Sequence, residues 1–432
     1  MKTKSILLAA IAVFSASSAF ADGGENGNKV KLKPYGFVRN YATFDSRAVK
    51  ALAEDSFYFL PLDRALAPDG TDKNAVYSYN FYSITTRLGV DISGYKYGNL
   101  FVSGKIESDF YCLNSGGNTG TLRMRQAFMD LLWKNEGRTD YKLRIGQAWH
   151  PLAADMPHVL GLETGSPFNP FNRSAQVMFD AITPSGIPLT AGATQQMQYR
   201  SAGPKTADVT ASEQSNRFQK HAFPELYAGV SYRKNGFLGR LGVDVVNIRP
   251  QYGYADDGKK YSNLMTGVSP FIFLQYTGDK FQVKAKSVLA QSGEHMQLNG
   301  GYAAVAGTTG TDTEYTPISS TVSFLSASWL LSQQFKLMAF AGYQKNLGAA
   351  KDIDPARVYF SGNGFKNIVD MFRVGPTLVY SIGKTEFGLE YSLTSVQYSD
   401  AAGLGTDGLP ADTDNTHQVG NSRVLLMAKL NF

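Results

Sequence analysis

The sequence predicts an all-β fold, a transmembrane antiparallel β-barrel of about sixteen strands with short periplasmic turns and long extracellular loops. Three observations support this prediction. Long segments alternate apolar with polar residues, short and long connections follow each other in turn, and the chain ends in a two-faced segment closed by Phe432. Successive side chains of a strand point to opposite faces, so each segment has one face for hydrocarbon and one for water. A soluble β-sandwich also alternates, so strand length and loop asymmetry distinguish the two.

The N-terminus has the features of a cleaved Sec signal peptide. Two lysines precede the apolar stretch 6–14, and the small-x-small triplet Ala19-Phe20-Ala21 follows it. A stretch of about nine apolar residues is too short to cross a bilayer as a helix. We therefore expect residues 1–21 to be removed, residues 22–29 to form a short N-terminal segment, and residues 30–432 to form one barrel domain in the bacterial outer membrane.

The mature sequence divides into alternating segments that are generally ten or more residues long. A membrane-crossing strand needs about 9–11 residues, whereas strands of globular proteins average about five or six. The weakest of the expected strands is 174–182, and loss of one hairpin would leave fourteen strands. We expect strands near 30–44, 76–93, 99–111, 122–134, 139–148, 174–182, 187–199, 223–234, 237–249, 262–277, 280–292, 317–331, 335–347, 365–382, 386–399 and 417–432.

Connections between these segments alternate in length, as in bacterial barrels. Aromatic residues cluster beside the short turns, which predicts an interfacial girdle. The short turns are expected near Gly94–Gly98, Asn135–Thr139, Pro184–Ile187, Lys234–Phe237, Thr277–Lys280, Leu331–Phe335 and Gly383–Glu386. The long loops are expected near 45–75, 112–121, 149–173, 200–222, 250–261, 293–316, 348–364 and 400–416.

Composition excludes several classes of function. The single Cys112 cannot form an internal disulfide, and a net charge of +6 without a basic run gives no support for nucleic-acid binding. The sequence has no Ser/His/Asp or paired-acid signature that would predict an enzyme. His150, Asp155, His158 and Glu163 share one loop, but their spacing matches no known metal-ligand pattern. We therefore expect neither a cofactor nor a metal.

Charged residues on the polar faces of the strands are the candidate functional residues. Charges on the lipid face would cost about 2–4 kcal/mol each near the midplane, so alternation assigns them to the lumen. Arginine keeps its charge and presents five donors, which suits it to carboxylate and phosphate groups. An anion-guiding ladder and ion pairs that brace the wall, such as Arg87 with Glu107, both remain open. The predicted pore-lining residues are Arg87, Lys105, Glu107, Asp109, Arg123, Arg125 and Arg144.

The third long loop, 149–173, is unusually rich in apolar and small residues. Such a loop should pack against a surface, either inside the lumen, which it would narrow, or at a subunit contact. If it folds inward, Asp155, Glu163 and Arg173 are the charges expected to flank the constriction.

Four short motifs stand out along the chain: Tyr35-Gly36-Phe37-Val38, Arg123-x-Arg125 with Gln126-Ala127-Phe128, Gly146-Gln147 and Asn169-Pro170-Phe171. Together they resemble the DcaP-like trimeric outer-membrane porins, closest to those of Bacteroides-like bacteria. The resemblance implies a homotrimer and an arginine ladder on the strand wall at Arg87, Arg123, Arg125 and Arg144. The DcaP-like prototype carries an N-terminal coiled helix, for which residues 22–29 are too short.

These features predict a passive channel for small hydrophilic solutes with a mild preference for anions such as carboxylates. The expected partners are these solutes, outer-membrane lipid, and the barrel-insertion machinery, which would read the terminal Phe432. Two alternatives remain: a hydrophobic-solute channel of the fatty-acid type with about fourteen strands, and a structural or adhesive barrel that binds a partner through loop 45–75.

Overall fold

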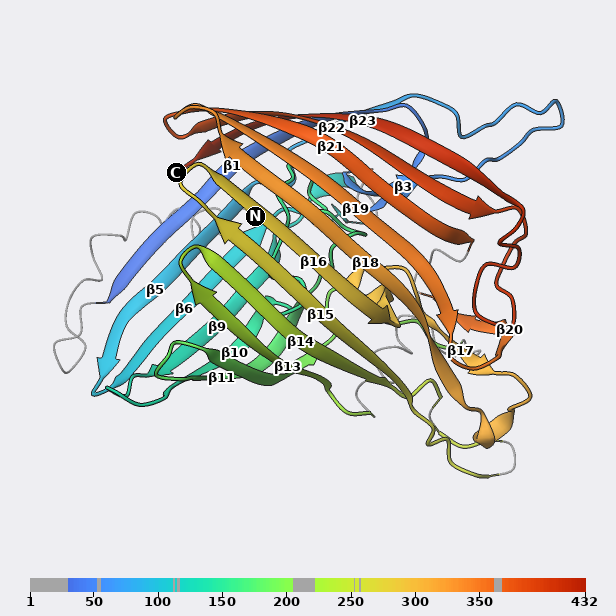
Figure 1. The fold of residues 1–432 in the computed structure, drawn as a ribbon, viewed down its shortest axis with the longest axis horizontal. Helices are drawn as coiled ribbons and strands as arrows, with labels where there is room; N and C mark the ends of the chain where they lie inside the picture. The colour runs from blue at the N-terminus through green and yellow to red at the C-terminus, as the bar shows by residue number, and fades with distance from the viewer. Residues whose placement is uncertain are drawn as a thin grey trace, which may run out of the picture.

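The structure is a computed structural model, which describes residues 30–52, 56–111, 113–114, 117–204, 222–251, 253–255, 258–360 and 367–432. The expected signal peptide 1–21, the segment 22–29 and Cys112 lie outside the described residues. The described chain forms a closed sixteen-stranded antiparallel barrel (Figure 1). Closure comes from β1 (Lys31–Asp45), which pairs with β23 (Thr416–Asn431) on one side and with β4 (Ser78–Tyr82) and β5 (Arg87–Tyr97) on the other.

The strand prediction is confirmed, including the weakest segment, which is β11 in the structure. The fourteen-stranded possibility is wrong. β4 and β5 together form one wall strand, interrupted at residues 83–86. The remaining wall strands are β6 (Leu100–Asp109), β9 (Arg123–Trp133), β10 (Asp140–Trp149), β11 (Arg173–Ile182), β12 (Pro188–Gln195), β13 (Glu225–Lys234), β14 (Phe237–Ile248), β15 (Met265–Thr277), β16 (Phe281–Gln291), β18 (Tyr315–Leu330), β19 (Phe335–Ala349), β21 (Ile368–Ile382) and β22 (Thr385–Ser399).

Shorter elements lie in the connections. They are β2 (Val49–Leu52), β3 (Phe57–Pro61), β7 (Leu113–Asn114), β8 (Gly117–Gly120), β17 (Tyr302–Val305), β20 (Ile353–Tyr359) and the 3₁₀ helices η2 (Gly293–Met296) and η3 (Gly310–Asp312). None of the helical segments in the described part of the chain has the length and hydropathy that a membrane span requires.

Side chains along the wall strands alternate between the inside and the outer face of the barrel, as the sequence pattern predicts. In β15, Phe271 and Phe273 are buried inside the barrel, whereas Ile272 and Leu274 between them are exposed on the outer face. Aromatic residues beside the short turns contact one another on neighbouring strands. The ring pairs are Tyr232–Phe237, Tyr276–Phe281, Phe281–Trp329 and Phe335–Tyr380, with centroids 5.0–6.4 Å apart. These contacts form a row of rings at the rim of short turns, where Phe432 also lies, paired to Gly36 of β1.

One turn differs from the expectation near Gly94–Gly98. A register shift between Ile92 and Tyr95 allows β5 to continue to Tyr97. The chain then reverses at Gly98 and Asn99, where Gly98 has a φ of 61°, a conformation that glycine adopts without a steric penalty.

The hydrophobic core lies within the barrel and not between layers. Three connections turn inward to build it: the loop between β10 and β11, β3, and η2. The loop comprises residues 150–172 and is called the inner loop below. β3 is buried along its whole length and packs against β22 and β23. The η2 residues are also buried, and the backbone N–H of Phe171 in the inner loop donates to the carbonyl of Met296, at 2.8 Å.

Candidate functional site

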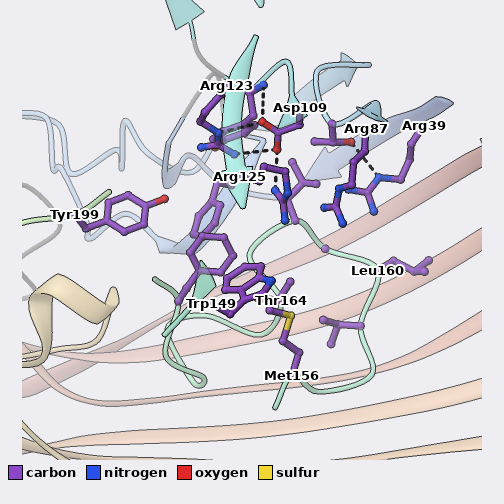
Figure 2. A pocket seen from close by; sticks show the side chains of 17 residues that line it. Arg39, Arg87, Asp109, Arg123, Arg125, Trp149, Met156, Leu160, Thr164 and Tyr199 are labelled. Atoms are coloured by element: carbon purple, nitrogen blue, oxygen red, sulfur yellow. Dashed lines mark hydrogen bonds and ion pairs between the residues drawn. The ribbon is translucent and has the colours of Figure 1, made fainter. Parts of the chain in front are cut away.

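A cavity of about 230 Å³ lies inside the barrel between one part of the wall and the inner loop. Its wall side carries Arg39, Thr85, Arg87, Asp109, Arg123 and Arg125, and its loop side carries Met156, Val159, Leu160, Gly161, Leu162 and Thr164. Figure 2 shows the arginines on the strands facing Leu160, Thr164 and Met156 of the loop. The cavity therefore has one basic wall and one largely apolar, uncharged wall.

Strand alternation places the arginines inside. On β1, Arg39 lies on the same face as Tyr41, which is buried in the lumen, while the neighbouring Val38 is exposed on the outer face. On β9, Arg123 and Arg125 are two residues apart and share the inner face. Because β9 and β5 flank β6, their arginines meet the β6 carboxylates Glu107 and Asp109.

Ion pairs brace this basic wall. Arg125 binds Glu107 at 2.8 Å through Nε and Asp109 at 2.7 Å through Nη1. Arg123 binds Asp109 at 2.9 Å, and Arg87 lies 3.6 Å from Glu107. Charge-assisted, partly bidentate bonds of this kind fix the guanidinium planes. Bracing and a basic lining are therefore compatible on this wall.

Arg39 is the exception among these arginines. Its Nε donates to the Thr85 hydroxyl at 3.0 Å, and its guanidinium lies over the Phe37 and Tyr41 rings at 4.8 and 5.0 Å. Within the described residues, no carboxylate pairs with Arg39. Four arginines thus lie at the cavity while two carboxylates, Glu107 and Asp109, neutralise part of their charge.

Three of the predicted pore-lining residues, Lys105, Glu107 and Arg144, lie on the inner wall outside the cavity lining. Lys105 binds Asp91 at 2.8 Å and contacts the Tyr35 ring. Arg144 binds Asp130 at 2.7 Å and lies 4.0 Å from the Phe128 ring centroid.

Strands on several sides of the barrel hold the inner loop. The Glu390 carboxylate on β22 accepts from the backbone N–H groups of Leu160 and Gly161, at 2.6 and 3.3 Å. The Tyr41 hydroxyl donates to the Leu160 carbonyl at 2.6 Å, and Lys286 on β16 donates to the Leu152 carbonyl at 2.7 Å. These contacts join β1, β16 and β22 through the loop, which therefore crosses the interior.

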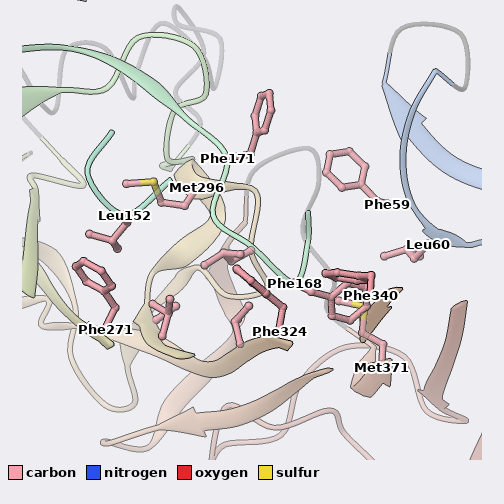
Figure 3. Packing of buried hydrophobic residues seen from close by; sticks show 14 of the residues in the cluster. Phe59, Leu60, Leu152, Phe168, Phe171, Phe271, Met296, Phe324, Phe340 and Met371 are labelled. Carbon is pink, nitrogen blue, oxygen red and sulfur yellow. The ribbon is translucent and has the colours of Figure 1, made fainter. Parts of the chain in front are cut away.

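Apolar packing adds to these bonds. Leu152, Phe168 and Phe171 of the inner loop are 1–4% exposed, and they belong to one buried cluster with wall residues such as Phe324 and Phe340. Figure 3 shows Phe168 beside Phe324 and Phe340, with Leu152 near Phe271. Burial of one such side chain is worth about 1.5–3 kcal/mol, so the loop is firmly held.

The three loop charges expected at the constriction are engaged elsewhere and do not line the cavity. Asp155 pairs with Arg240 at 3.3 Å, and Glu163 lies 3.5 Å from Arg373. Arg173 is 1% exposed and stacks over the Trp149 ring at 4.7 Å. The physical reason is that the loop directs Asp155 and Glu163 to the wall that it packs against, whereas Arg173 already belongs to that wall as the first residue of β11.

Burial changes the acidity of two loop residues. It raises the pKa of the Glu163 carboxyl to about 7, although the Arg373 guanidinium acts in the opposite direction. It lowers the pKa of the His158 imidazole to about 4, and the nearby lysines Lys284 and Lys336 act in the same direction.

Sequence reasoning missed part of this site. The lumen-facing phase of Arg39 was obscured because the aromatic residues Tyr35 and Phe37 share its face. The role of Lys286, Arg373 and Glu390 as loop anchors had no local signal, since their partners are more than 100 residues away in the chain.

A second polar cluster lies apart from this cavity. His150 does not gather with Asp155, His158 and Glu163 of its own loop. It meets Glu225 of β13 and Asp244 of β14, and the three side chains offer ligand atoms within 4.8 Å of one another. This juxtaposition joins residues far apart in the chain, so local spacing could not predict it.

The fold is that of the bacterial outer-membrane porins. The DcaP channel of Acinetobacter baumannii is similar, with a TM-score of 0.61, 17% identity and coverage of 96% of this chain and 100% of that chain. The trimer form of OmpT from Vibrio cholerae has a TM-score of 0.51, 14% identity and coverage of 93% and 99%. The anion-selective porin from Comamonas acidovorans has a TM-score of 0.50, 12% identity and coverage of 94% and 100%.

No protein-family model matches the chain, and no curated protein matches it in sequence. At the identities given above, structural similarity establishes the fold alone. The particular resemblance to porins of Bacteroides-like bacteria stays a prediction.

Proposed function

We propose that this protein is a passive outer-membrane channel for small hydrophilic solutes, with a mild preference for anions such as carboxylates. One observation carries the proposal: an arginine-lined cavity lies between the barrel wall and a loop that crosses the interior. A sixteen-stranded barrel encloses an aqueous channel, so such a narrowing would set its selectivity.

The mechanism combines size exclusion with electrostatic attraction. The inner loop narrows the passage, and its contacts with Glu390, Lys286 and Tyr41 keep it in place. Anions would meet the arginines on the opposite wall. Because Glu107 and Asp109 neutralise part of this charge, the preference for anions is mild.

This proposal assigns ion preference to the wall and the width of the passage to the loop. Arg39, Arg87, Arg123 and Arg125 act directly on a passing solute. Lys105 and Arg144 contribute to the potential from farther along the wall. Asp155, Glu163 and Arg173 act indirectly, by holding the loop against the wall or at its base.

Assembly and targeting belong to the same proposal. A cleaved signal peptide over residues 1–21 would direct export, and the insertion machinery would read the terminal Phe432. The chain would then act as a homotrimer in the outer membrane. Support for the trimer comes from the similar fold of the Vibrio cholerae protein, which has a trimer form.

The two alternatives are less well supported. The sixteen-stranded wall departs from the fourteen strands expected of a fatty-acid-type channel. The adhesive alternative needs an exposed loop between β1 and β4, residues 46–77. Part of this loop, β3, is buried inside the barrel, so only exposed residues such as Tyr77, which is 89% exposed, are open to a partner.

Purified protein in planar bilayers and in liposomes tests the proposal. It should give stable ion conductance, and a small dicarboxylate should enter liposomes faster than a neutral solute of equal size. Absence of conductance above background from correctly folded protein would overturn the channel assignment.

A further inference from the structure

Four ionisable side chains form a buried cluster where the inner loop joins the wall. His150 directly follows β10, Glu225 opens β13, Asp244 lies in β14, and His295 lies in η2. Their exposed fractions are between 0% and 2%. Burial of charged groups is costly unless they are paired or bind a metal, so this cluster requires an explanation beyond packing.

The distances within the cluster have the scale of a metal-binding site. His150 Nε2 lies 2.9 Å from Glu225 Oε1 and 3.5 Å from Asp244 Oδ1. Around a tetrahedral zinc ion with ligands at about 2.0–2.1 Å, neighbouring ligand atoms are about 3.3 Å apart. The two measured distances bracket this spacing, and the three side chains offer ligand atoms that all lie within 4.8 Å of one another.

Hydrogen bonding accounts for only part of this cluster. Within the described residues, His150 Nε2, Asp244 Oδ1 and the second Glu225 oxygen, Oε2, are buried and have no hydrogen-bond partner, whereas Glu225 Oε1, the oxygen close to His150, is contacted by His295 Nε2 at 3.3 Å. His150 Nε2 is close to two carboxylate oxygens yet forms a well-aligned hydrogen bond to neither. Such off-axis proximity is the arrangement that atoms adopt around a common central ion.

We propose that His150, Glu225 and Asp244 bind one divalent transition-metal ion of the zinc class. An imidazole nitrogen with two carboxylates suits such an ion, whereas Ca²⁺ and Mg²⁺ prefer oxygen ligands alone. His295 supports the site from outside: its Nε2 lies 3.3 Å from Glu225 Oε1, and its Nδ1 lies 3.0 Å from the Ser292 carbonyl. The Glu225 carboxylate is thus linked through His295 to the Ser292 carbonyl, and hydrogen bonds of this kind orient a carboxylate that binds a metal.

Metal binding requires a proton to move on His150. The Leu152 backbone N–H donates to His150 Nδ1 at 3.2 Å, which places the ring proton on Nε2. Coordination through Nε2 moves the proton to Nδ1, so the Leu152 contact must lengthen when the metal binds.

The metal would join the start of the inner loop to the neighbouring strands β13 and β14, which lie far from it in the chain. His150 is the first residue of the inner loop, and η2 contacts the other end of that loop through Asn172 Nδ2, which donates to the His295 carbonyl at 2.8 Å. The ion would thus fix both ends of the loop against β13 and β14. The site stands on its own geometry and does not depend on solute transport.

Zinc binding to the full chain in detergent tests the proposal. After chelation and dialysis, elemental analysis and calorimetry at pH 8 should give about one zinc per chain, and zinc should raise the thermal midpoint. His150→Gln and Asp244→Asn should each weaken zinc binding by roughly 100-fold or more, because one of the three side chains that hold the ion is lost. His417→Gln is the matched control, since His417 lies between the exposed carboxylates Asp63 and Asp400 and could bind zinc adventitiously.

Each other outcome overturns the proposal. Unchanged binding in both ligand variants, with loss in His417→Gln, would identify an adventitious surface ion. No zinc binding to the wild type would identify a purely ionic network. If the ligand variants fail to fold, X-ray absorption of zinc-loaded His417→Gln protein decides, since that protein lacks the surface histidine. A nitrogen and oxygen shell with imidazole scattering is expected, and its absence contradicts the site.

Discussion

Replacement of Arg39 by glutamine should weaken anion preference without harming the barrel. Arg39 lines the cavity, and no described carboxylate pairs with it, so Arg39→Gln leaves no buried acid without a partner. The variant loses the stacking of Arg39 on Phe37 and Tyr41, which is worth about 0.5–1 kcal/mol at exposed sites. We therefore expect a folded barrel with one positive charge fewer at the narrowing.

The size of the effect follows from the cavity dimensions. A sphere of about 230 Å³ has a radius of roughly 4 Å, so an ion at its centre lies roughly 6 Å from the guanidinium charge. At that distance one charge contributes about 0.7 kcal/mol in water, and about 0.4 kcal/mol at 0.1 M salt. Anions should pass about twofold more slowly and cations about twofold faster, so the anion-to-cation ratio should fall about fourfold.

Reversal potential under a tenfold KCl gradient measures this ratio directly. Arg144→Gln is the matched control, because it removes the same charge from the wall at a position outside the cavity lining. Asp130, the partner of Arg144, still has an ion pair with Lys142 at 3.5 Å in this variant. The control should shift the reversal potential less than Arg39→Gln. Equal shifts in both variants, or none in Arg39→Gln, would refute the assignment of selectivity to the cavity wall.

Three further predictions concern the inner loop. Glu390→Ala removes the carboxylate that accepts hydrogen bonds from the Leu160 and Gly161 N–H groups, and each of these bonds is worth about 1.5–3 kcal/mol. The loop should then be held less firmly, so the noise of the single-channel current should increase. Unchanged noise would contradict anchoring of the loop by Glu390. Gly388→Val should lower the channel conductance, because a Cβ at position 388 would lie 2.4 Å from Leu160 Cδ1 and push the Leu160 side chain into the cavity. The control Leu389→Val, on the outer face of the same strand, should leave the conductance unchanged. Since burial raises the pKa of Glu163 from 4.5 to about 7, the folded state holds a proton that the unfolded state releases, so stability should fall as pH rises from 4.5 to 7. Glu163→Gln should reduce this fall by up to roughly 3 kcal/mol in thermal unfolding at pH 5 and pH 8, and an unaltered fall would exclude Glu163 as its source.

The barrel wall was predictable from the sequence because strand periodicity is a local property. A residue's face follows from its neighbours two positions away, so each wall strand could be located from its own segment. Strand ends, the break at residues 83–86 between β4 and β5, and local register shifts escaped this reasoning. The register shift in β5 between Ile92 and Tyr95, for example, depends on pairing with β6.

The interior was predictable only in part. The apolar composition of loop 149–173 indicated packing, and the run Phe57-Tyr58-Phe59-Leu60 in loop 46–77 carried the same kind of signal for β3. Which wall groups meet these loops depends on barrel closure, which sequence spacing does not contain. His150 with Glu225 and Asp244, and Glu390 with Leu160, are contacts of this kind.

The sign of the wild-type reversal potential under a KCl gradient is the most direct measurement of the proposed function. Four arginines line the cavity, and only two carboxylates pair with them, Asp109 in the lining and Glu107 outside it. This excess of positive charge predicts a potential displaced toward the chloride equilibrium value. A potential displaced toward the potassium value, from a channel whose conductance is otherwise stable, would contradict the basic wall as the determinant of selectivity.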